Sequence, residues 1–270
     1  EFWNALDQIP DAALWQTRRH MKRELLAFIQ HRACHRWADD HVDPGQAIAF
    51  GALLEPDAFT IGFARRFATY KRADLIFRDS ARLRRILYNR RRPVQLVFAG
   101  KAHPADEAGK AMLQAVYRAA RDPEFAGRIA ILEDYDMHAA RWLVQGVDLW
   151  LNNPRAPLEA CGTSGMKAGL NGVPNLSILD GWWVEGHGHG NGWAFGDEGG
   201  LEADHAAQDA RDAEALYALL EGTIVPLYYA RDPSGVPTTW LRVVRRAIQT
   251  VTPRFSARRM MKEYVSTLYR

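Results

Sequence analysis

The fold can be worked out from one stretch, Val94-Gln95-Leu96-Val97-Phe98-Ala99-Gly100, and from the runs that are similar to it. This stretch is short, almost continuously apolar and closed by a glycine, which is typical of a β-strand buried on both faces. Further strand-like runs follow the same pattern, and they are Phe59–Ala64, Ile129–Leu132, Val147–Leu151, Asn175–Leu179 and Trp193–Phe195. Six such runs predict a buried sheet at the centre of the molecule.

The segments between these strands carry apolar residues at helical spacing. Examples are residues 106–120, residues 137–144 and a segment that begins near Cys161. Strands that alternate with helices in this rhythm are typical of βαβ units and a parallel sheet. We therefore predict an α/β fold with a doubly wound, Rossmann-like parallel sheet, in which ligands bind at the carboxyl ends of the strands.

Helices are also predicted on either side of the sheet-forming region. Asp11 is an N-cap candidate for a helix that reaches about residue 32, and a polar linker, Asp39–Gly45, follows it. The last third of the chain is predicted to be helical, at Ala213–Tyr228, Val236–Ile248 and a segment after Ser256. The predicted organisation is an N-terminal helical segment with its linker, a Rossmann-like domain and a C-terminal helix, at residues 1–45, 46–250 and 251–270.

The composition is that of an ordinary globular protein, with 47% apolar and 25% charged residues among 270. No apolar run approaches the roughly 20 residues of a membrane helix, and the chain begins at Glu1 as expected of a piece of a longer protein. Its two cysteines favour a reducing compartment, so we expect a cytoplasmic protein. The net charge of +3 does not indicate nucleic-acid binding, and the arginine-rich residues 82–92 have the helical apolar spacing of a surface helix.

A run of cations directly follows the first predicted strand: Arg65-Arg66-Phe67-Ala68-Thr69-Tyr70-Lys71-Arg72. Arginine offers a planar fork of donors and lysine a point charge, and both suit phosphate. The amino end of a helix adds a partial positive charge. The run is therefore a candidate anion cage, although a solvated basic helix start explains the same residues equally well.

A second constellation, Glu159-Ala160-Cys161-Gly162-Thr163-Ser164-Gly165-Met166-Lys167, follows the fourth predicted strand. Small residues let the backbone wrap closely around a phosphate, and Thr163 adds a hydroxyl. The spacing of a Walker sequence is absent. Lys167 suits either an anion contact or a Schiff base with an aldehyde cofactor. The residues alone also allow a helix cap with an ordinary surface lysine.

A third constellation, Asp180-Gly181-Trp182-Trp183, is followed by several glycines up to Gly192. It suggests a flexible loop with an aromatic stacking surface for sugar rings. The alternative is a loop whose tryptophans anchor it in the core, which explains one of the two tryptophans at least as well, and the pattern leaves both interpretations open.

Taken together, these motifs resemble α-glucan phosphorylases, specifically their C-terminal half, which carries pyridoxal 5'-phosphate. The Gly-Thr-Ser-Gly-Met-Lys segment resembles the cofactor segment of the shorter bacterial and archaeal branch. The resemblance extends over about residues 55–200, and its other motifs occur in the family's order: Arg65–Arg72, Gly100-Lys101-Ala102, Glu133-Asp134-Tyr135 and Asp180-Gly181. The fold that this implies is the C-terminal domain of a GT-B glycosyltransferase architecture.

The resemblance also implies a role for individual residues. Lys167 would carry the cofactor, and Arg66 and Lys71 would clamp the cofactor phosphate and the substrate phosphate. Glu159 and Gly162 would contact the glucosyl unit. The remaining cofactor contacts would come from Tyr135, Gly162, Thr163 and Ser164. No metal site is expected, and the role of Lys101 stays open.

The implied reaction is the attack of orthophosphate on an α-1,4-glucan, which gives glucose 1-phosphate with retention of configuration. The implied partners are the glucan, orthophosphate and the N-terminal half of the same enzyme, and a homo-oligomer is compatible with the resemblance. We expect no nucleic-acid or membrane partner, and no turnover by this chain alone. Two alternatives are a nucleotide-sugar glycosyltransferase, which often has a second glutamate at the position of Lys167, and a glucan-binding module without catalysis.

Overall fold

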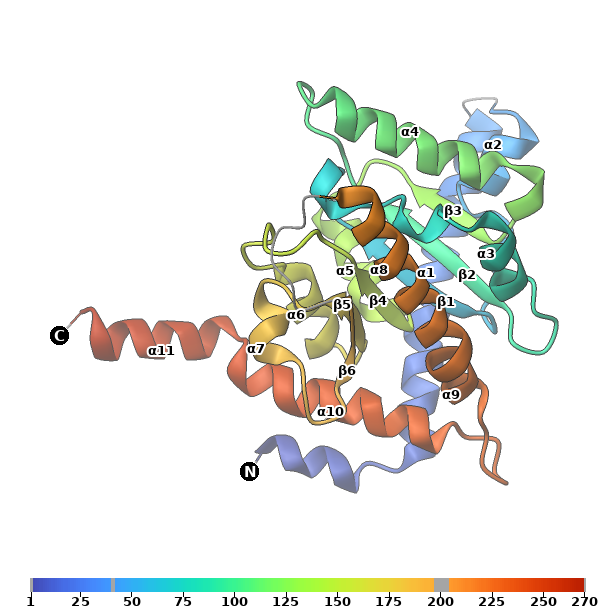
Figure 1. Cartoon of the computed structure of the whole chain (residues 1–270). Helices are drawn as coiled ribbons and strands as arrows, with labels where there is room; N and C mark the ends of the chain where they lie inside the picture. The colour runs from blue at the N-terminus through green and yellow to red at the C-terminus, as the bar shows by residue number, and fades with distance from the viewer. Residues whose placement is uncertain (1, 40–41, 197–203, 270) are drawn as a thin grey trace.

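The computed structural model of the chain describes residues 2–39, 42–196 and 204–269. Figure 1 shows a central sheet whose described strands are β1 (Phe59–Ala64), β2 (Val94–Ala99), β3 (Ile129–Leu132), β4 (Leu149–Asn152), β5 (Asn175–Ile178) and β6 (Gly192–Phe195). Their order is β3-β2-β1-β4-β5-β6, and every pair of neighbours is parallel. The predicted doubly wound, Rossmann-like sheet is confirmed.

The strand order fixes where a ligand is expected. The chain moves from β1 outward to β2 and β3, and then returns to place β4 on the other side of β1. The connections therefore leave β1 and β4 in opposite directions, which opens a crevice beyond their carboxyl ends. This topological switch point is the place to look for a functional site.

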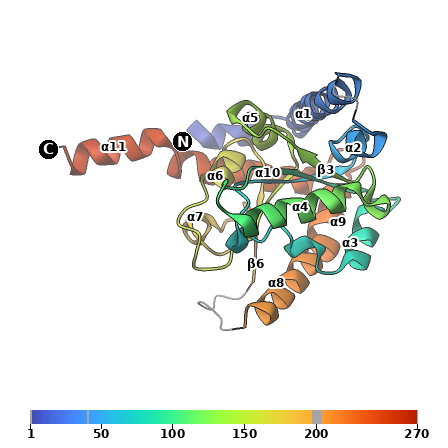
Figure 2. The same cartoon turned by 90° about the horizontal axis from the view of Figure 1, so that it is seen from above.

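Helices cover both faces of the sheet, with α1 and α5 on one face and α3 and α8 on the other (Figure 2). The described helices are α1 (Asp11–Asp39), α2 (Pro44–Ala49), α3 (Ser80–Leu87), α4 (Glu107–Arg121), α5 (Met137–Gly146), α6 (Thr163–Leu170), α7 (Trp182–Gly186), α8 (His205–Leu219), α9 (Val225–Tyr229), α10 (Thr238–Arg254) and α11 (Ala257–Thr267). Short 3-10 turns add η1 (Phe2–Gln8), η2 (Thr69–Lys71), η3 (Leu75–Phe77) and η4 (Pro123–Phe125), and a π-helical turn, η5 (Leu220–Ile224), joins α8 to α9.

The alternation of side chains along β2 explains why its sequence is apolar throughout. Leu96 and Phe98 enter one core, whereas Val97 and Ala99 enter the core beneath α1 and α5. Successive side chains of a strand point to opposite faces, so a strand covered on both sides needs apolar residues at every position.

The predicted linker at 39–45 is shorter in the structure. Helix α1 continues to Asp39, and α2 begins at Pro44, while residues 40 and 41 lie outside the described residues. Asp43 starts α2 through a capping box, because its carboxylate accepts from the Gln46 backbone amide at 3.1 Å and Gln46 accepts from the Asp43 amide at 3.3 Å. Local capping, not apolar periodicity, starts this short helix.

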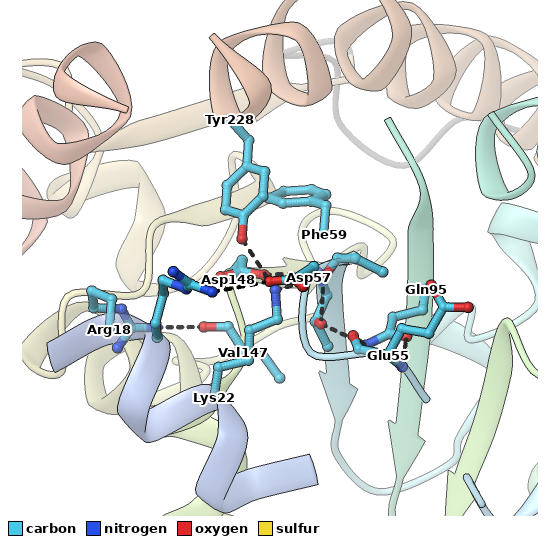
Figure 3. A network of polar contacts seen from close by, with 12 residues as sticks. Arg18, Lys22, Glu55, Asp57, Phe59, Gln95, Val147, Asp148 and Tyr228 are labelled. Atoms are coloured by element: carbon cyan, nitrogen blue, oxygen red, sulfur yellow. Dashed lines mark hydrogen bonds and ion pairs between the residues drawn. The ribbon is translucent and has the colours of Figure 1, made fainter. Parts of the chain in front are cut away.

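A buried polar network ties α1 and α9 to the amino ends of β1 and β4 (Figure 3). The Lys22 ammonium donates to the Ala58 carbonyl at 2.5 Å, to Asp148 Oδ2 at 2.5 Å and to the Tyr228 hydroxyl at 3.1 Å. Asp148 Oδ2 also accepts from the Thr60 amide at 2.9 Å. Burial lowers the pKa of Lys22, and the Asp148 carboxylate opposes that shift. Every ammonium donor therefore has a partner, as a buried charge requires.

Two helices lie at the surface in different ways. α3 buries Leu83, Ile86 and Leu87 and turns Arg82 outward to the carboxylates of Glu214 and Glu221. This arrangement confirms the predicted amphipathic surface helix. α11 has no buried residue and projects from the body of the molecule (Figure 1).

Within the described ranges, none of the helices combines the length and apolarity that crossing a membrane requires.

Candidate functional site

A buried cluster of charged side chains lies at the switch point of the sheet. Arg65 follows the last residue of β1, and Asn152 is the last residue of β4. The Arg65 guanidinium donates through Nη1 to Asn152 Oδ1 and through Nη2 to Glu159 Oε2. Arg65 is only 8% exposed, and burial lowers the pKa of its guanidinium, while Glu159 opposes that shift.

Lys71 contacts the same carboxylate from the other side. Its ammonium lies 3.0 Å from Glu159 Oε2 and 3.2 Å from Oε1, and the residue is 7% exposed. Two buried cations, Arg65 and Lys71, therefore share one buried carboxylate. The buried Asp180 carboxylate also acts on Arg65, but without an ion pair, so the two cations have one carboxylate in direct contact and offer donors to an anion.

Arg72 holds the loop that carries Lys71. Its backbone is left-handed at φ 46°, and its guanidinium donates to the carbonyl oxygens of Asn153 and Pro154, each at 2.9 Å. The Arg155 amide donates to the Tyr70 carbonyl at 2.7 Å, and Arg72 also pairs with acidic residues of α8. These hydrogen bonds join the loop after β1, which carries Lys71, to the segment after β4, which leads to Glu159. Tyr70 and Arg72, the two neighbours of Lys71, both take part.

Asp180 and Gly181 hold the segment that carries Glu159. The Glu159 amide donates to Asp180 Oδ2 at 2.8 Å, and the Trp182 amide donates to the Cys161 carbonyl at 2.9 Å. Gly181 has φ 54°, and a Cβ at this position would lie 2.4 Å from the Cys161 carbonyl oxygen. Only glycine allows this approach, which explains the Asp-Gly pair of the sequence motif.

The turn into α6 leaves the amino end of that helix uncapped by a side chain. Gly162 is the N-cap, with φ 86° and ψ 50°. A Cβ there would lie 3.8 Å from Glu159 Cγ, so the turn lies directly beside the charged cluster. The buried Nε of Arg65 also lacks a hydrogen-bond partner among the described residues. Free helix amides and an unpaired guanidinium donor are suited to binding an anion.

Lys167 lies farther along α6 and is exposed. Together with Thr163 it lines a groove of about 480 Å³, which continues to Phe255 and Met260 at the α10–α11 junction. The structure brings Thr163 and Lys167 to one groove, and Lys71 and Glu159 into direct contact. The turn at Gly162 lies between this groove and the Lys71–Glu159 contact.

The other predicted site residues stand apart from these contacts. Arg66 is exposed and makes no hydrogen bond or ion pair within the described part of the chain. Ser164 is half-buried in the first turn of α6. Tyr135 is half-buried against the core beneath α1, and burial raises the pKa of its hydroxyl. Lys101 is exposed in a separate groove of about 550 Å³, lined in part by Tyr117. The roles of these residues remain predictions.

The suggested aromatic stacking surface is wrong, because both tryptophans are buried. Trp182 is 3% exposed and Trp183 is fully buried, and the Trp183 indole donates to the Trp193 carbonyl at 3.2 Å. A Cβ at Gly186 would lie 2.6 Å from the Trp182 ring, and one at Gly192 would lie 3.0 Å from the Trp183 ring. Gly186 and Gly192 let the backbone pack against the two indoles.

Arg65 is the site residue that sequence reasoning missed. It was part of the basic run, but roles were predicted only for Arg66 and Lys71. The sequence signal that could have identified Arg65 was its position directly after a central strand, because side chains at that position lie at the switch point.

Among the described residues, no three histidine, cysteine, aspartate or glutamate side chains gather in a way that could hold a metal ion.

Comparisons with known proteins place the chain in one family. A family model described as carbohydrate phosphorylase matches residues 51–218. The chain is 51% identical to a glycogen phosphorylase of Aquifex aeolicus and 48% identical to a maltodextrin phosphorylase of Thermococcus litoralis, in each case over 99% of this chain. It is 45% identical to a glycogen phosphorylase of Mycobacterium bovis over the same share. The matched region is 38% of the first relative and 31% of the other two, so the chain spans about a third of their length.

Proposed function

Because the chain belongs to the carbohydrate phosphorylase family, we propose that it is the cofactor-bearing C-terminal part of an α-glucan phosphorylase. The whole enzyme would use orthophosphate to release glucose 1-phosphate from an α-1,4-glucan with retention of configuration. The observation that carries this proposal is the buried pair of Arg65 and Lys71, which shares the single carboxylate of Glu159 beside the uncapped end of α6.

The residues present fit pyridoxal 5'-phosphate. Its phosphate needs cations and amide donors, which Arg65, Lys71 and the first turn of α6 would supply. Thr163 and Ser164 would add hydroxyl donors. Its aldehyde needs an accessible amine, and Lys167 offers one in the groove that it shares with Thr163. Tyr135 would contribute to the wall of the pocket.

When bound, this cofactor would supply a phosphate whose second pKa is about 6 and which exchanges protons readily near neutral pH. Two phosphates placed side by side repel each other, so the protein must supply positive charge between them. We assign this task to Lys71 and Arg66. Lys71 acts from the buried side, and Arg66, which is exposed, meets the substrate phosphate from the open side. Glu159 and Gly162 would hold the glucosyl unit.

The remaining parts of the proposal concern what surrounds the chain. The relatives are about three times as long, which supports an N-terminal half as the partner that completes the site and the glucan groove. The free cysteines Cys34 and Cys161 are compatible with a reducing, cytoplasmic location. The family match favours phosphorolysis over transfer from a nucleotide sugar. Burial of Trp182 and Trp183 removes the surface that a simple glucan-binding module would have used.

The proposal is tested by incubating maltodextrin and orthophosphate with two proteins, the full-length parent and this chain, each loaded with pyridoxal phosphate. We expect glucose 1-phosphate from the parent and none from the chain alone. A pure parent that retains the cofactor but forms no glucose 1-phosphate would exclude the assigned reaction. Turnover by the chain alone would show that the N-terminal half is not needed.

A further inference from the structure

The Glu159 carboxylate lies where an incoming anion would have to bind. Both of its oxygens contact Lys71, and one of them also accepts from Arg65. Its side chain is 7% exposed, so these two cations replace water as its partners. The backbone of Glu159 is fixed by the bond from its amide to Asp180. The carboxylate can therefore leave the cations by side-chain rotation while the loop stays in place.

We propose that Glu159 is a resident anion of the Arg65–Lys71 pair, which phosphate must displace in order to bind. The displaced carboxylate then becomes the acceptor for hydroxyl groups of the sugar. This inference rests on the proposed function of the site, and it adds an ordered exchange of partners that couples the two ligands.

Charge explains why the exchange proceeds. A phosphate carries about −1.5 to −2 charges at pH 7, whereas a carboxylate carries one, so phosphate matches the two cations better. Phosphate also has more acceptor oxygens, which can reach the unpaired Nε of Arg65 and the free amides of α6. The exchange has a cost, because Glu159 loses its charged partners in a buried place.

Hydroxyl donors of a sugar would offset that cost. Phosphate and sugar thus favour the same state, in which Glu159 has left the cations. By linkage, each ligand must then tighten the binding of the other by the same factor. A site in which Glu159 served only as a sugar ligand would not show this coupling.

The test measures the dissociation constant of inorganic phosphate for this chain by calorimetry at constant ionic strength. Three variants are compared with the wild type. Glu159→Gln removes the resident charge and is expected to bind phosphate at least about ten-fold more tightly. Glu159→Asp keeps the charge on a shorter side chain and should lie between the two. Glu185→Gln is the control, because Glu185 is exposed and forms its ion pair with Arg254, not with Arg65 or Lys71. Its charge acts on Cys161, which lies in the same loop as Glu159.

The outcomes separate clearly. Tighter binding by Glu159→Gln, with Glu185→Gln within about two-fold of wild type, supports the resident anion. Equal or weaker binding by a folded Glu159→Gln, or no phosphate binding by any form, overturns it. If Glu159→Gln does not fold, Glu159→Asp decides in the same way. The coupling is measured on the full-length parent, whose N-terminal half completes the glucan groove. Saturating maltose should tighten phosphate binding there in the wild type and not in Glu159→Gln, and no effect of maltose on the wild-type parent overturns the coupling.

The proposed function can fail separately from this inference. Reductive attachment of pyridoxal phosphate reads out a covalent bond to Lys167, whereas the resident anion is tested by the difference in phosphate affinity between the wild type and Glu159→Gln. A chain that is labelled at Lys167, but shows no tighter phosphate binding in Glu159→Gln, keeps the proposed function and loses the resident anion. A chain that shows the tighter binding but is never labelled at Lys167 keeps the resident anion and loses the proposed function.

Discussion

The two ends of the sheet each hold a buried carboxylate with buried cations, yet they differ in how completely the donors of those cations are paired. At the amino end, Asp148 is contacted by one cation, Lys22, whose three donors all have partners. At the carboxyl end, Glu159 is contacted by two cations, Arg65 and Lys71, and the Nε of Arg65 has no partner among the described residues. The first cluster is balanced, because every donor of Lys22 has a partner, and we propose that an anion completes the second, unbalanced cluster.

Helix α6 contributes to both clusters, with opposite signs. Arg18 lies near its carboxyl end, where it donates to the Asn171 carbonyl at 3.0 Å, and it also donates to the Gln145 and Val147 carbonyls at the end of α5. Carbonyls at helix ends carry partial negative charge and offset that cation. The amino end of α6 carries partial positive charge, which adds to the positive charge of Arg65 and Lys71. The comparison teaches that a buried ion cluster indicates a binding site when donors of its cations are left without partners.

The largest expected effect comes from breaking the balanced cluster. Lys22→Ala would leave the buried Asp148 carboxylate with the Thr60 amide and no ion pair, with Arg18 acting on it only from farther away. We therefore expect a loss of about 3–5 kcal/mol in the free energy of unfolding. Urea denaturation measures it. Arg19→Ala on the same helix is the control, because its ion pair with Asp57 is exposed and should cost less than about 1 kcal/mol. Equal losses in the two variants would contradict the structural role of the amino-end cluster.

A smaller loss is expected where the backbone holds Glu159 in place. Gly181→Ala would force a Cβ against the Cys161 carbonyl at a φ of 54°, and we expect a cost of about 1–3 kcal/mol. The variant should also lose affinity for phosphate, since the turn into α6, whose free amides would contact the phosphate, would shift. Gly222→Ala is the matched control, because no atom lies within 4 Å of the position that its Cβ would take. A Gly181→Ala chain with wild-type stability would show that this approach is not constrained.

Two tyrosines near the amino end of the sheet, Tyr228 and Tyr229, also predict that the free energy of unfolding depends on pH in the alkaline range. Burial raises the pKa of Tyr229 to about 12, and burial raises the pKa of Tyr228 well above its usual value. The unfolded chain therefore loses its tyrosine protons first, near pH 10, so the free energy of unfolding should fall as pH rises from about 10 to 12. Tyr229→Phe should cost about 1 kcal/mol at neutral pH through its lost hydrogen bonds, and its alkaline decline should be shallower. Tyr264→Phe, on the exposed α11, should keep the wild-type slope, and an unchanged slope in Tyr229→Phe would refute the assignment.

The smallest change in stability, with a clear change in binding, is expected at the unbalanced cluster. Lys71→Ala leaves Glu159 paired with Arg65, so the free energy of unfolding should change by no more than about 1 kcal/mol. Retention of pyridoxal phosphate after gel filtration should fall about ten-fold or more, because a charged hydrogen bond to phosphate is lost. Lys110→Ala, whose exposed pair is with Glu107, should change neither quantity. A large loss of stability with unchanged cofactor retention would contradict this assignment, because it would mean that the carboxyl-end cluster stabilises the fold and does not bind the cofactor.

Much of the fold could be predicted from the sequence because each central strand is covered on both faces. Such strands read as apolar runs, and the predicted Phe59–Ala64 and Val94–Ala99 have the observed bounds. The prediction was less exact at β4, which begins at Leu149 and extends to Asn152. Asp148 serves the amino-end cluster, and Asn152 donates to Ser177 at 3.0 Å, so polar residues enter where the strand meets a cluster.

The candidate site was predictable in its segments but not in the direction of its side chains. The basic run, the Glu159 segment and the Asp180-Gly181 pair do meet. Adjacent residues at a strand end point to opposite sides, however, so the sequence could not tell that Arg65 is buried and Arg66 exposed. The amino-end cluster had no local signal, because Lys22 and Asp148 are 126 positions apart.

The most direct test of the account is borohydride reduction of this chain after incubation with pyridoxal phosphate, followed by peptide mass mapping. We predict one dominant pyridoxyl adduct, on Lys167, which excess inorganic phosphate reduces by competing for the cations beside α6. Labelling spread over exposed lysines, or none on Lys167 in a folded chain, would contradict the claim that the carboxyl end of the sheet is a cofactor site.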